Sequence, residues 1–377
     1  MDVTPFFKLM VDKDASDLFF TVDAPINMKV EGLMNPVGKA ALTSQQSRQM
    51  AYSIMTDKQQ KEFDDNLELN MAISLPGLGR FRVNVFRQKN EVSMVIRYIK
   101  PEIPSLESLN LPPILKDIIM EMRGLILVVG ATSSGKSTSL ASMIDHRNSN
   151  HRGHILMIED PIEFIHQQKK SIVDQREVGL DTHSFDSALK NAMRQAPDVI
   201  LIGEIRDKLR MQNAIAYAET GHLCLSTLHA NNANQTMDRI LNFFPEDARH
   251  QLLIDLSLNL RAIISQRLIP GLKQKRVPAV EILINSPYIS DLIEKNKIEE
   301  IKEVMERSRE AGMQTFDQAL FDLYQNGEID QENALKFADS RNNLRLKIRM
   351  SEDHTLDTDN NIEIETDKDD MGGMNSF

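Results

Sequence analysis

The stretch that decides the fold is Gly124-Leu-Ile-Leu-Val-Val-Gly130-Ala-Thr-Ser-Ser-Gly135-Lys136-Ser137-Thr138. An apolar, strand-like run ends in the pattern Gly-x-x-x-x-Gly-Lys-Ser, and helix-forming residues follow. A glycine- and serine-rich surface turn is the alternative interpretation, but it does not explain a lysine directly after the second glycine. A strand before and a helix after are the required setting of a P-loop, whose backbone N–H groups cradle phosphate oxygens.

This loop supplies the candidate nucleotide-binding residues. Lys136 is expected to reach the β- and γ-phosphates of ATP, and the Ser137 hydroxyl to help hold Mg²⁺. The sequence therefore predicts ATP and Mg²⁺ as ligands. The candidate binding residues are Gly130, Ala131, Thr132, Ser133, Ser134, Gly135, Lys136, Ser137 and Thr138.

Length and composition are those of a soluble globular protein. The 377 residues are enough for two or three domains, with 41% hydrophobic and 26% charged residues. No apolar run approaches the ~20 residues that span a bilayer, and the first residues lack the features of a signal peptide. The single cysteine, Cys224, excludes a disulfide framework and a cysteine-cluster zinc site, and reads as an inert buried thiol. We expect a cytoplasmic protein without a transmembrane segment.

The net charge of −11 is unevenly distributed. Residues 351–377 contain nine acidic residues and one lysine, so this segment contributes −8. Such a segment is expected to be disordered, as an acidic interaction tail or simply a solubilising end. Neither part of the chain has the basic surplus of a nucleic-acid-binding domain, so we expect no nucleic-acid partner.

Two kinds of pattern divide the rest of the chain. Residues 1–100 are predicted to form a small α+β domain, and the four prolines of residues 101–113 an interdomain linker. The expected elements are helices at 4–13 and 44–61 and strands at 17–22, 80–86 and 91–99, the last two paired across residues 88–90.

From residue 114 to 285, short apolar runs alternate with helical patterns. This is typical of a parallel sheet covered on both faces. Residues 286–350 are predicted to be purely helical, at 288–307, 313–325 and 331–349. The expected strands are 125–129, 155–158, 199–202, 223–227 and 280–284.

Two acidic groups follow these strands. Glu159, Asp160 and Glu163 come directly after a buried strand, where a carboxylate can orient the water that attacks a γ-phosphate. They could also be ordinary loop acids. Glu204, after Gly203 at the end of the next strand, has the Walker B position beside the Mg²⁺ shell, so Ser137 and Glu204 are the candidate metal-binding residues.

Histidines and arginines are further candidates. His222 and His229 flank one strand; such histidines are more often structural, but His229 at the strand end is a candidate γ-phosphate sensor. Arg80, Arg82 and Arg97 lie on strands of the first domain. They are either solvated strand residues or arginine fingers supplied across a subunit boundary.

Together these motifs resemble the ATPase family of type II secretion and type IV pili, the GspE/PulE-like proteins. The stretch Arg194-x-x-Pro197-Asp198-x-x-x-x-Gly203-Glu204-x-Arg206-Asp207 is similar to the family signature at every defined position. Ile158-Glu-Asp-Pro-Ile-Glu163 resembles the aspartate box, and Gly221-His222 through His229 the histidine box. The resemblance extends from residue 15 to about residue 349.

The resemblance implies a homohexamer of subunits with a PAS-like N-terminal domain and a RecA-like ATPase domain. It implies that Glu163 is the catalytic carboxylate, that Glu204 is the Walker B acid and that His229 reads the γ-phosphate. Arg82 and Arg97 are implied to reach a neighbouring subunit's nucleotide. The implied location is the inner-membrane base of the pilus machine, with a platform protein as partner.

Within the family the chain resembles the retraction branch of PilT and PilU, since it has a short N-terminal region and no four-cysteine motif. PilT-like chains carry the motif AIRNLIRE, for which this chain has residues 288–295, with Ser290 and Glu294 in place of both arginines. This departure and the acidic extension resemble PilU, so dependence on a PilT-type partner is expected. The rival hypotheses are a non-hydrolytic accessory subunit that binds PilT and, less favoured, a RecA-like nucleic-acid motor.

Overall fold

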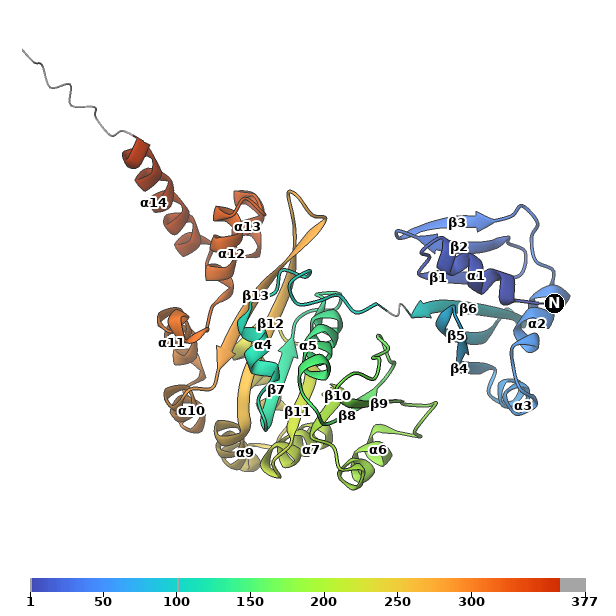
Figure 1. The fold of residues 1–377 in the computed structure, drawn as a ribbon, viewed down its shortest axis with the longest axis horizontal. Helices are drawn as coiled ribbons and strands as arrows, with labels where there is room; N and C mark the ends of the chain where they lie inside the picture. The colour runs from blue at the N-terminus through green and yellow to red at the C-terminus, as the bar shows by residue number, and fades with distance from the viewer. Residues whose placement is uncertain (1, 100–101, 360–377) are drawn as a thin grey trace, which may run out of the picture. The chain divides into compact units, whose positions relative to one another are not determined.

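The computed structural model describes residues 2–99 and 102–359, with side chains up to residue 351. The chain divides into two compact units, Met1–Leu268 with Val280–Thr315 and Ile269–Ala279 with Phe316–Phe377. The larger unit contains two sheets, and the smaller one is mainly helical. Figure 1 gives the element labels used below.

The N-terminal segment is built on a six-stranded antiparallel sheet, which confirms the expected α+β character. The strand order is β3-β2-β1-β6-β5-β4. β5 and β6 pair across Lys89 and Asn90, whose φ angles of 49° and 65° allow a two-residue turn. The strands are β1 (Asp17–Phe20), β2 (Ile26–Val30), β3 (Leu33–Val37), β4 (Glu68–Leu75), β5 (Gly79–Gln88) and β6 (Glu91–Ile99).

Three helices accompany this sheet: α1 (Thr4–Asp12), α2 (Ser44–Ser53) and α3 (Asp57–Asn66). The prediction of one helix over 44–61 was wrong. Thr56 accepts a hydrogen bond from the backbone of Gln59, whose side chain accepts one in return, so a capping box starts a new helix there.

The second sheet has seven strands in the order β13-β12-β7-β11-β10-β8-β9, and its pairs from β12 to β9 are parallel. All five predicted strands are present, whereas β9 and β12 were not predicted. The strands are β7 (Gly124–Val129), β8 (His154–Glu159), β9 (Ile172–Glu177), β10 (Val199–Glu204), β11 (Leu223–Leu228), β12 (Leu260–Pro270) and β13 (Arg276–Ile284).

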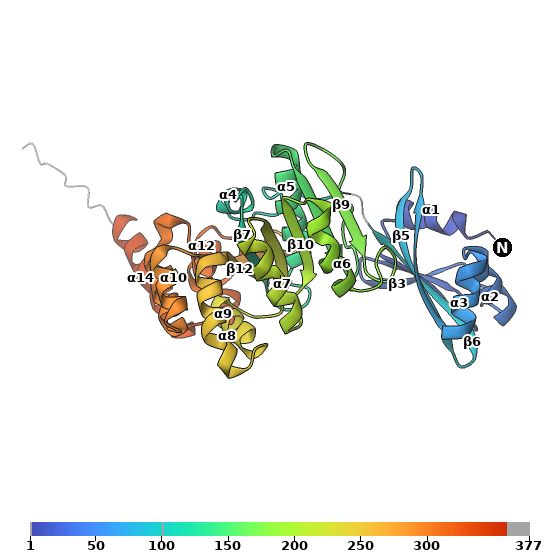
Figure 2. The ribbon, with the colours of Figure 1, turned by 90° about the horizontal axis from the view of Figure 1, so that it is seen from below.

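Helices cover both faces of this sheet, as Figure 2 shows edge-on. Strand β7 is buried throughout, with Leu125 and Leu127 in one core and Ile126 and Val128 in the other. The first core includes side chains of α6 (Phe185–Ala192), α7 (Lys208–Glu219), α8 (Ala233–Asn242), α9 (Glu246–Asn259) and α10 (Pro287–Glu294). The second includes α4 (Ile114–Ile119) and α5 (Lys136–Asn150).

The C-terminal part is helical, as predicted, but its helices are shorter. α10 ends at Glu294, and Asn296 with φ of 56° separates it from the next helices. The others are α11 (Ile301–Arg307), α12 (Phe316–Gln325), α13 (Gln331–Phe337) and α14 (Arg341–Asp359). The prediction of a disordered tail from residue 351 was wrong for residues 351–359, which continue α14 as helix, and the rest of the predicted acidic tail lies outside the described residues. Across the described residues, no helix is both long and apolar enough to cross a membrane.

Candidate nucleotide-binding and hydrolytic site

The loop between β7 and α5 has the backbone of a phosphate-binding loop. Gly135 has φ of +89°, and a Cβ atom there would lie 2.7 Å from Nε2 of Gln266, so only glycine fits. Helix α5 starts at Lys136 without a side-chain cap, which leaves its first N–H groups directed at a ligand. Ser134 Oγ is buried and has no hydrogen-bond partner among the described residues. These unpaired donors fit a phosphate group.

Lys136 lies folded across this loop. Its Nζ donates hydrogen bonds to the carbonyl oxygens of Gly130 at 2.8 Å and Ala131 at 2.7 Å. Burial lowers the pKa of Lys136, and the negative charge of Glu204 opposes that shift. The ammonium group is thus held at the loop by neutral acceptors, which an anionic phosphate can replace.

The Walker B strand places Glu204 beside the histidine-box strand. Glu204 forms an ion pair with Arg206, whose Nε lies 2.6 Å from Glu204 Oε2. The Oε1 atom of Glu204 lies 3.0 Å from Nε2 of His229. β10 and β11 shift register at Gly203, and Thr227 donates a hydrogen bond to the Gly203 carbonyl oxygen at 2.7 Å. A Cβ atom on Gly203 would lie 3.2 Å from the Cα of Glu159, so glycine lets the ends of β10 and β8 approach closely.

The aspartate-box carboxylates meet the P-loop serine at a small cavity of about 40 Å³. Ser137, Glu159 and Glu163 all line it. Burial raises the pKa of Glu159 to about 8, and the hydrogen bond from Gln175 at 3.1 Å opposes this rise. Glu163 is exposed. The Glu159 carboxyl is therefore protonated at neutral pH, whereas Glu163 is exposed to solvent and lines the same cavity as Ser137.

Other parts of the motifs lie away from this site. His222 precedes β11 and contacts Thr220 and the Tyr217 carbonyl, so the length of the strand, roughly 20 Å, separates it from His229. Asp198, before β10, accepts a hydrogen bond from the His154 backbone at 2.8 Å. The structure gives His222 and Asp198 local structural contacts.

Two of the three candidate arginines are neighbours in the N-terminal sheet. Arg82 of β5 and Arg97 of β6 are register partners. Arg97 also forms an ion pair with Asp17 at 2.8 Å, and its side chain is 59% exposed. Exposure leaves its guanidinium accessible to an anion.

Two glutamines belong to the site although no sequence pattern indicated them. Gln266 of β12 packs against Gly135 and accepts a hydrogen bond from Ser139 of α5 at 2.7 Å. Gln175 of β9 binds Glu159 and the loop after it. Both lie on the two strands that were not predicted, and a lone glutamine carries no motif signal.

The donor set suits Mg²⁺. Among the described residues, no cluster of three or more His, Cys, Asp or Glu side chains could hold a metal ion. Ser137 and Glu204 offer one hydroxyl and one carboxylate instead. Mg²⁺ keeps several waters and needs only one or two protein oxygens beside substrate phosphates, so these residues fit it.

A P-loop on a parallel sheet, with a glutamate at the expected Walker B position and an adjoining acidic segment, is typical of a P-loop ATPase. The family model of type II/IV secretion system proteins matches residues 2–350, and the chain belongs to that family.

The chain is similar to individual ATPases of type IV pili. The chain is 52% identical to the type IV pilus ATPase PilU of Pseudomonas aeruginosa, over 99% of both chains. It is 40% identical to the type IV pilus retraction ATPase PilT of the same organism, over 89% of this chain and 97% of PilT. A crystal structure of the pilus retraction motor PilT with bound ADP matches with a TM-score of 0.85 and 39% identity, over 92% of this chain and 99% of that one.

Proposed function

We propose that this chain is an ATP-hydrolysing motor subunit of type IV pilus retraction. The observation that carries the proposal is the convergence of Lys136, Glu163 and Glu204 at one edge of the sheet, in a chain 52% identical to PilU. A non-hydrolytic accessory subunit does not need this set of side chains intact.

In the proposed reaction, a water molecule attacks the γ-phosphorus of ATP and the bond to the bridging oxygen of ADP breaks. Glu163 orients the water and accepts its proton, because its carboxylate faces the cavity beside Ser137. Lys136 stabilises negative charge on the β- and γ-phosphates. Ser137 and Glu204 would hold Mg²⁺, which would neutralise phosphate charge when bound.

His229 is proposed to detect whether the γ-phosphate is present in the site. It shares Glu204 with Arg206, so the Glu204 carboxylate lies between one cation and one titratable ring. We infer that His229 reads the γ-phosphate through this contact. Arg82 and Arg97 are proposed to act on the nucleotide of an adjacent subunit in a homohexamer.

The proposed domains are 1–100, a PAS-like domain; 101–113, the linker; 114–285, the RecA-like core; 286–350, the helical region; and 351–377, the acidic tail. Hydrolysis is proposed to drive rotation between the first domain and the core through the linker. The motor is inferred to act at the cytoplasmic face of the inner membrane, on a platform protein and together with a PilT-type ATPase.

The test is the ATPase rate of the purified chain beside its Glu204→Ala variant. We expect loss of roughly 100-fold or more in kcat when the carboxylate is removed. Equal turnover by both proteins would contradict the Walker B role. In a further arm, an equal mixture of Lys136→Ala and Arg97→Ala subunits should regain roughly a quarter of the sites if the arginine acts across a subunit boundary; no recovery would contradict that role.

A further inference from the structure

The segment after Glu159 is held by one glutamine of the neighbouring strand. Nε2 of Gln175 donates to Oε1 of Glu159 at 3.1 Å and to the Phe164 carbonyl oxygen at 2.8 Å. Its Oε1 accepts a hydrogen bond from the backbone N–H of His166 at 2.8 Å. Both polar atoms of the Gln175 side-chain amide are therefore used in these three hydrogen bonds, which fix the backbone at His166.

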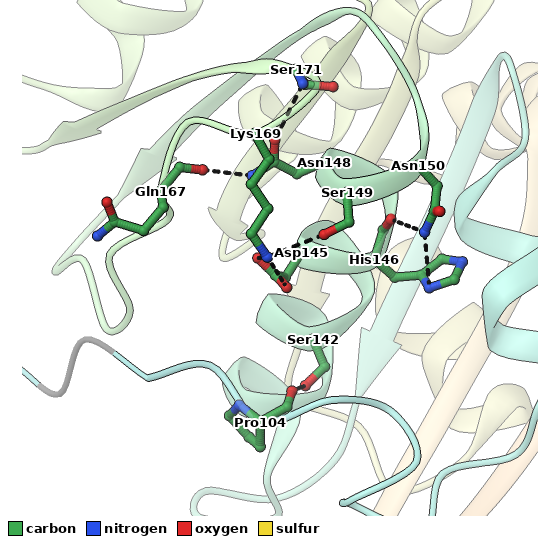
Figure 3. Close-up of polar contacts among 10 residues, drawn as sticks. All are labelled: Pro104, Ser142, Asp145, His146, Asn148, Ser149, Asn150, Gln167, Lys169 and Ser171. Carbon is green, nitrogen blue, oxygen red and sulfur yellow. Dashed lines mark hydrogen bonds and ion pairs between the residues drawn. The ribbon is translucent and has the colours of Figure 1, made fainter.

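Helix α5 holds the continuation of this segment (Figure 3). Asn148 donates to the Gln167 carbonyl oxygen at 2.7 Å and accepts from the Ser171 N–H at 3.3 Å. Lys169 donates to both carboxylate oxygens of Asp145 at 2.7 Å. The same helix begins at the P-loop lysine, so His166 is fastened to the element that carries the nucleotide-binding loop.

His166 itself is buried without a polar partner. Its exposed fraction is 6%, and neither ring nitrogen has a hydrogen-bond partner among the described residues. His166 lines the cavity of about 40 Å³ together with Ser137, Glu159 and Glu163. If the His166 ring only filled space, leucine would give a more stable protein at this position, because an unpaired buried polar group costs roughly 1–3 kcal/mol of folding free energy.

The cavity has the size and polarity that bound water requires. A water needs about 10–15 Å³ and two to four polar partners, and the residues that line the cavity include a histidine, two glutamates and a serine. Burial lowers the pKa of His166 to about 4; Asp145 on α5 opposes this shift and Lys169 in the same segment adds to it. The neutral ring thus has one donor and one acceptor nitrogen at physiological pH.

We propose that His166 binds a water molecule in this cavity and, through it, positions the carboxyl groups of Glu159 and Glu163 beside the P-loop serine. His166 is thereby a positioning residue for hydrolysis, an inference that rests on the proposed ATPase function. The hydrogen bonds that Gln175 and Asn148 form with the backbone of this segment keep the His166 ring at the cavity.

The experiment compares His166→Leu and His166→Gln with the unchanged chain, with His250→Leu on the exposed surface of α9 as the matched control. For each protein, kcat and the Kd of a fluorescent ATP analogue are measured. We expect His166→Leu to lose about 10- to 100-fold in kcat at nearly unchanged nucleotide Kd, because orientation is lost but binding is not. His166→Gln, which keeps a donor and an acceptor, should recover most of the rate, and the control should match the unchanged chain.

A kcat of His166→Leu equal to that of the control would overturn the proposal, as would an equal loss in His166→Gln with Kd unchanged. A high-resolution crystal structure is the readout that does not depend on hydrolysis. A water within hydrogen-bond distance of His166 and of either carboxyl supports the inference, and a dry cavity contradicts it. Absence of turnover in the unchanged chain would instead count against the proposed function.

Discussion

Glu159 ends β8 and Glu163 follows four residues later in the loop, yet their surroundings differ. Glu159 accepts a hydrogen bond from Gln175 and its carboxyl is buried, whereas Glu163 is exposed. Two carboxyls with different environments at a phosphate site are suited to different roles. We assign proton acceptance to Glu163 and a protonated, hydrogen-bonding role to Glu159.

The raised pKa of Glu159 makes stability depend on pH. The carboxyl stays protonated in the folded chain up to about pH 8, whereas it ionises near its ordinary value of 4.5 when unfolded. The contribution of the Glu159 carboxyl to the free energy of unfolding is therefore fully present below about pH 4.5. It is lost progressively as pH rises toward 8, by up to about 1.4 kcal/mol per pH unit.

Glu159→Gln removes this dependence, so its free energy of unfolding relative to the unchanged chain should rise between pH 5 and pH 8. Urea unfolding at both pH values measures it. Glu163→Gln, in the same loop but exposed, is the control and should show little change. If the difference in free energy of unfolding between Glu159→Gln and the unchanged chain did not vary with pH, Glu159 would not be protonated in the folded chain.

The sequence motifs predicted Lys136, Glu163 and Glu204 because a P-loop and strand-end acids have recognisable spacing. His229 was expected at the end of a strand beside the Walker B strand, but its contact with Glu204 was not predicted, because strand adjacency alone does not determine which side chains meet. His166 carried no signal either, because a lone histidine in a loop is common and its burial arises only when the segment folds onto α5.

At the scale of elements, α5 connects the P-loop to the aspartate-box segment. Its first turn carries Lys136 and Ser137, and its last turns hold residues 167–171 through Asn148 and Asp145. Ser142 also donates a hydrogen bond to the carbonyl of Pro104, which attaches the first part of the linker to the same helix. The helix thus connects the phosphate loop to both segments.

Asn148→Leu should weaken this connection. The Gln167 carbonyl and the buried Ser171 N–H would lose their partners, at a cost of about 1–3 kcal/mol in the free energy of unfolding. Amide hydrogen exchange should also accelerate over residues 163–171. Asn150→Ala, on the exposed side of the same helix, is the matched control, and an Asn148→Leu protein as stable as that control would contradict the assigned role.

Element prediction succeeded where apolar runs were continuous and failed where they were not. β9 reads Ile-Val-Asp-Gln-Arg-Glu, an edge strand with a polar outer face, and β12 follows α9 without any turn residues. Only the neighbouring strand makes either segment extended. By contrast, the break between α2 and α3 was readable from Thr56 and Gln59, and the single predicted helix overlooked that capping box.

At the scale of the whole molecule, the chain is similar to PilU over almost its full length and departs from the PilT-like motif in α10. In α10, Ser290 stands where PilT-like chains have arginine, and it donates a hydrogen bond to the Ser257 carbonyl at 2.8 Å. Asp291 pairs with Lys295 at 2.7 Å, and Glu294 is exposed. The surface of α10 therefore differs in charge from the PilT-like motif, which is consistent with a different partner and with the proposed need for a PilT-type ATPase.

The central claim is that this chain drives retraction through its own hydrolysis of ATP. The most direct measurement is the retraction of individual pili in cells that produce a PilT-type ATPase and, as their only copy of this chain, the Lys136→Ala variant at normal abundance. The account predicts that retraction is lost or much weakened, because the lysine that binds the β- and γ-phosphates is missing. Retraction at the full unmodified rate and force would contradict it and would identify the chain as a non-hydrolytic scaffold.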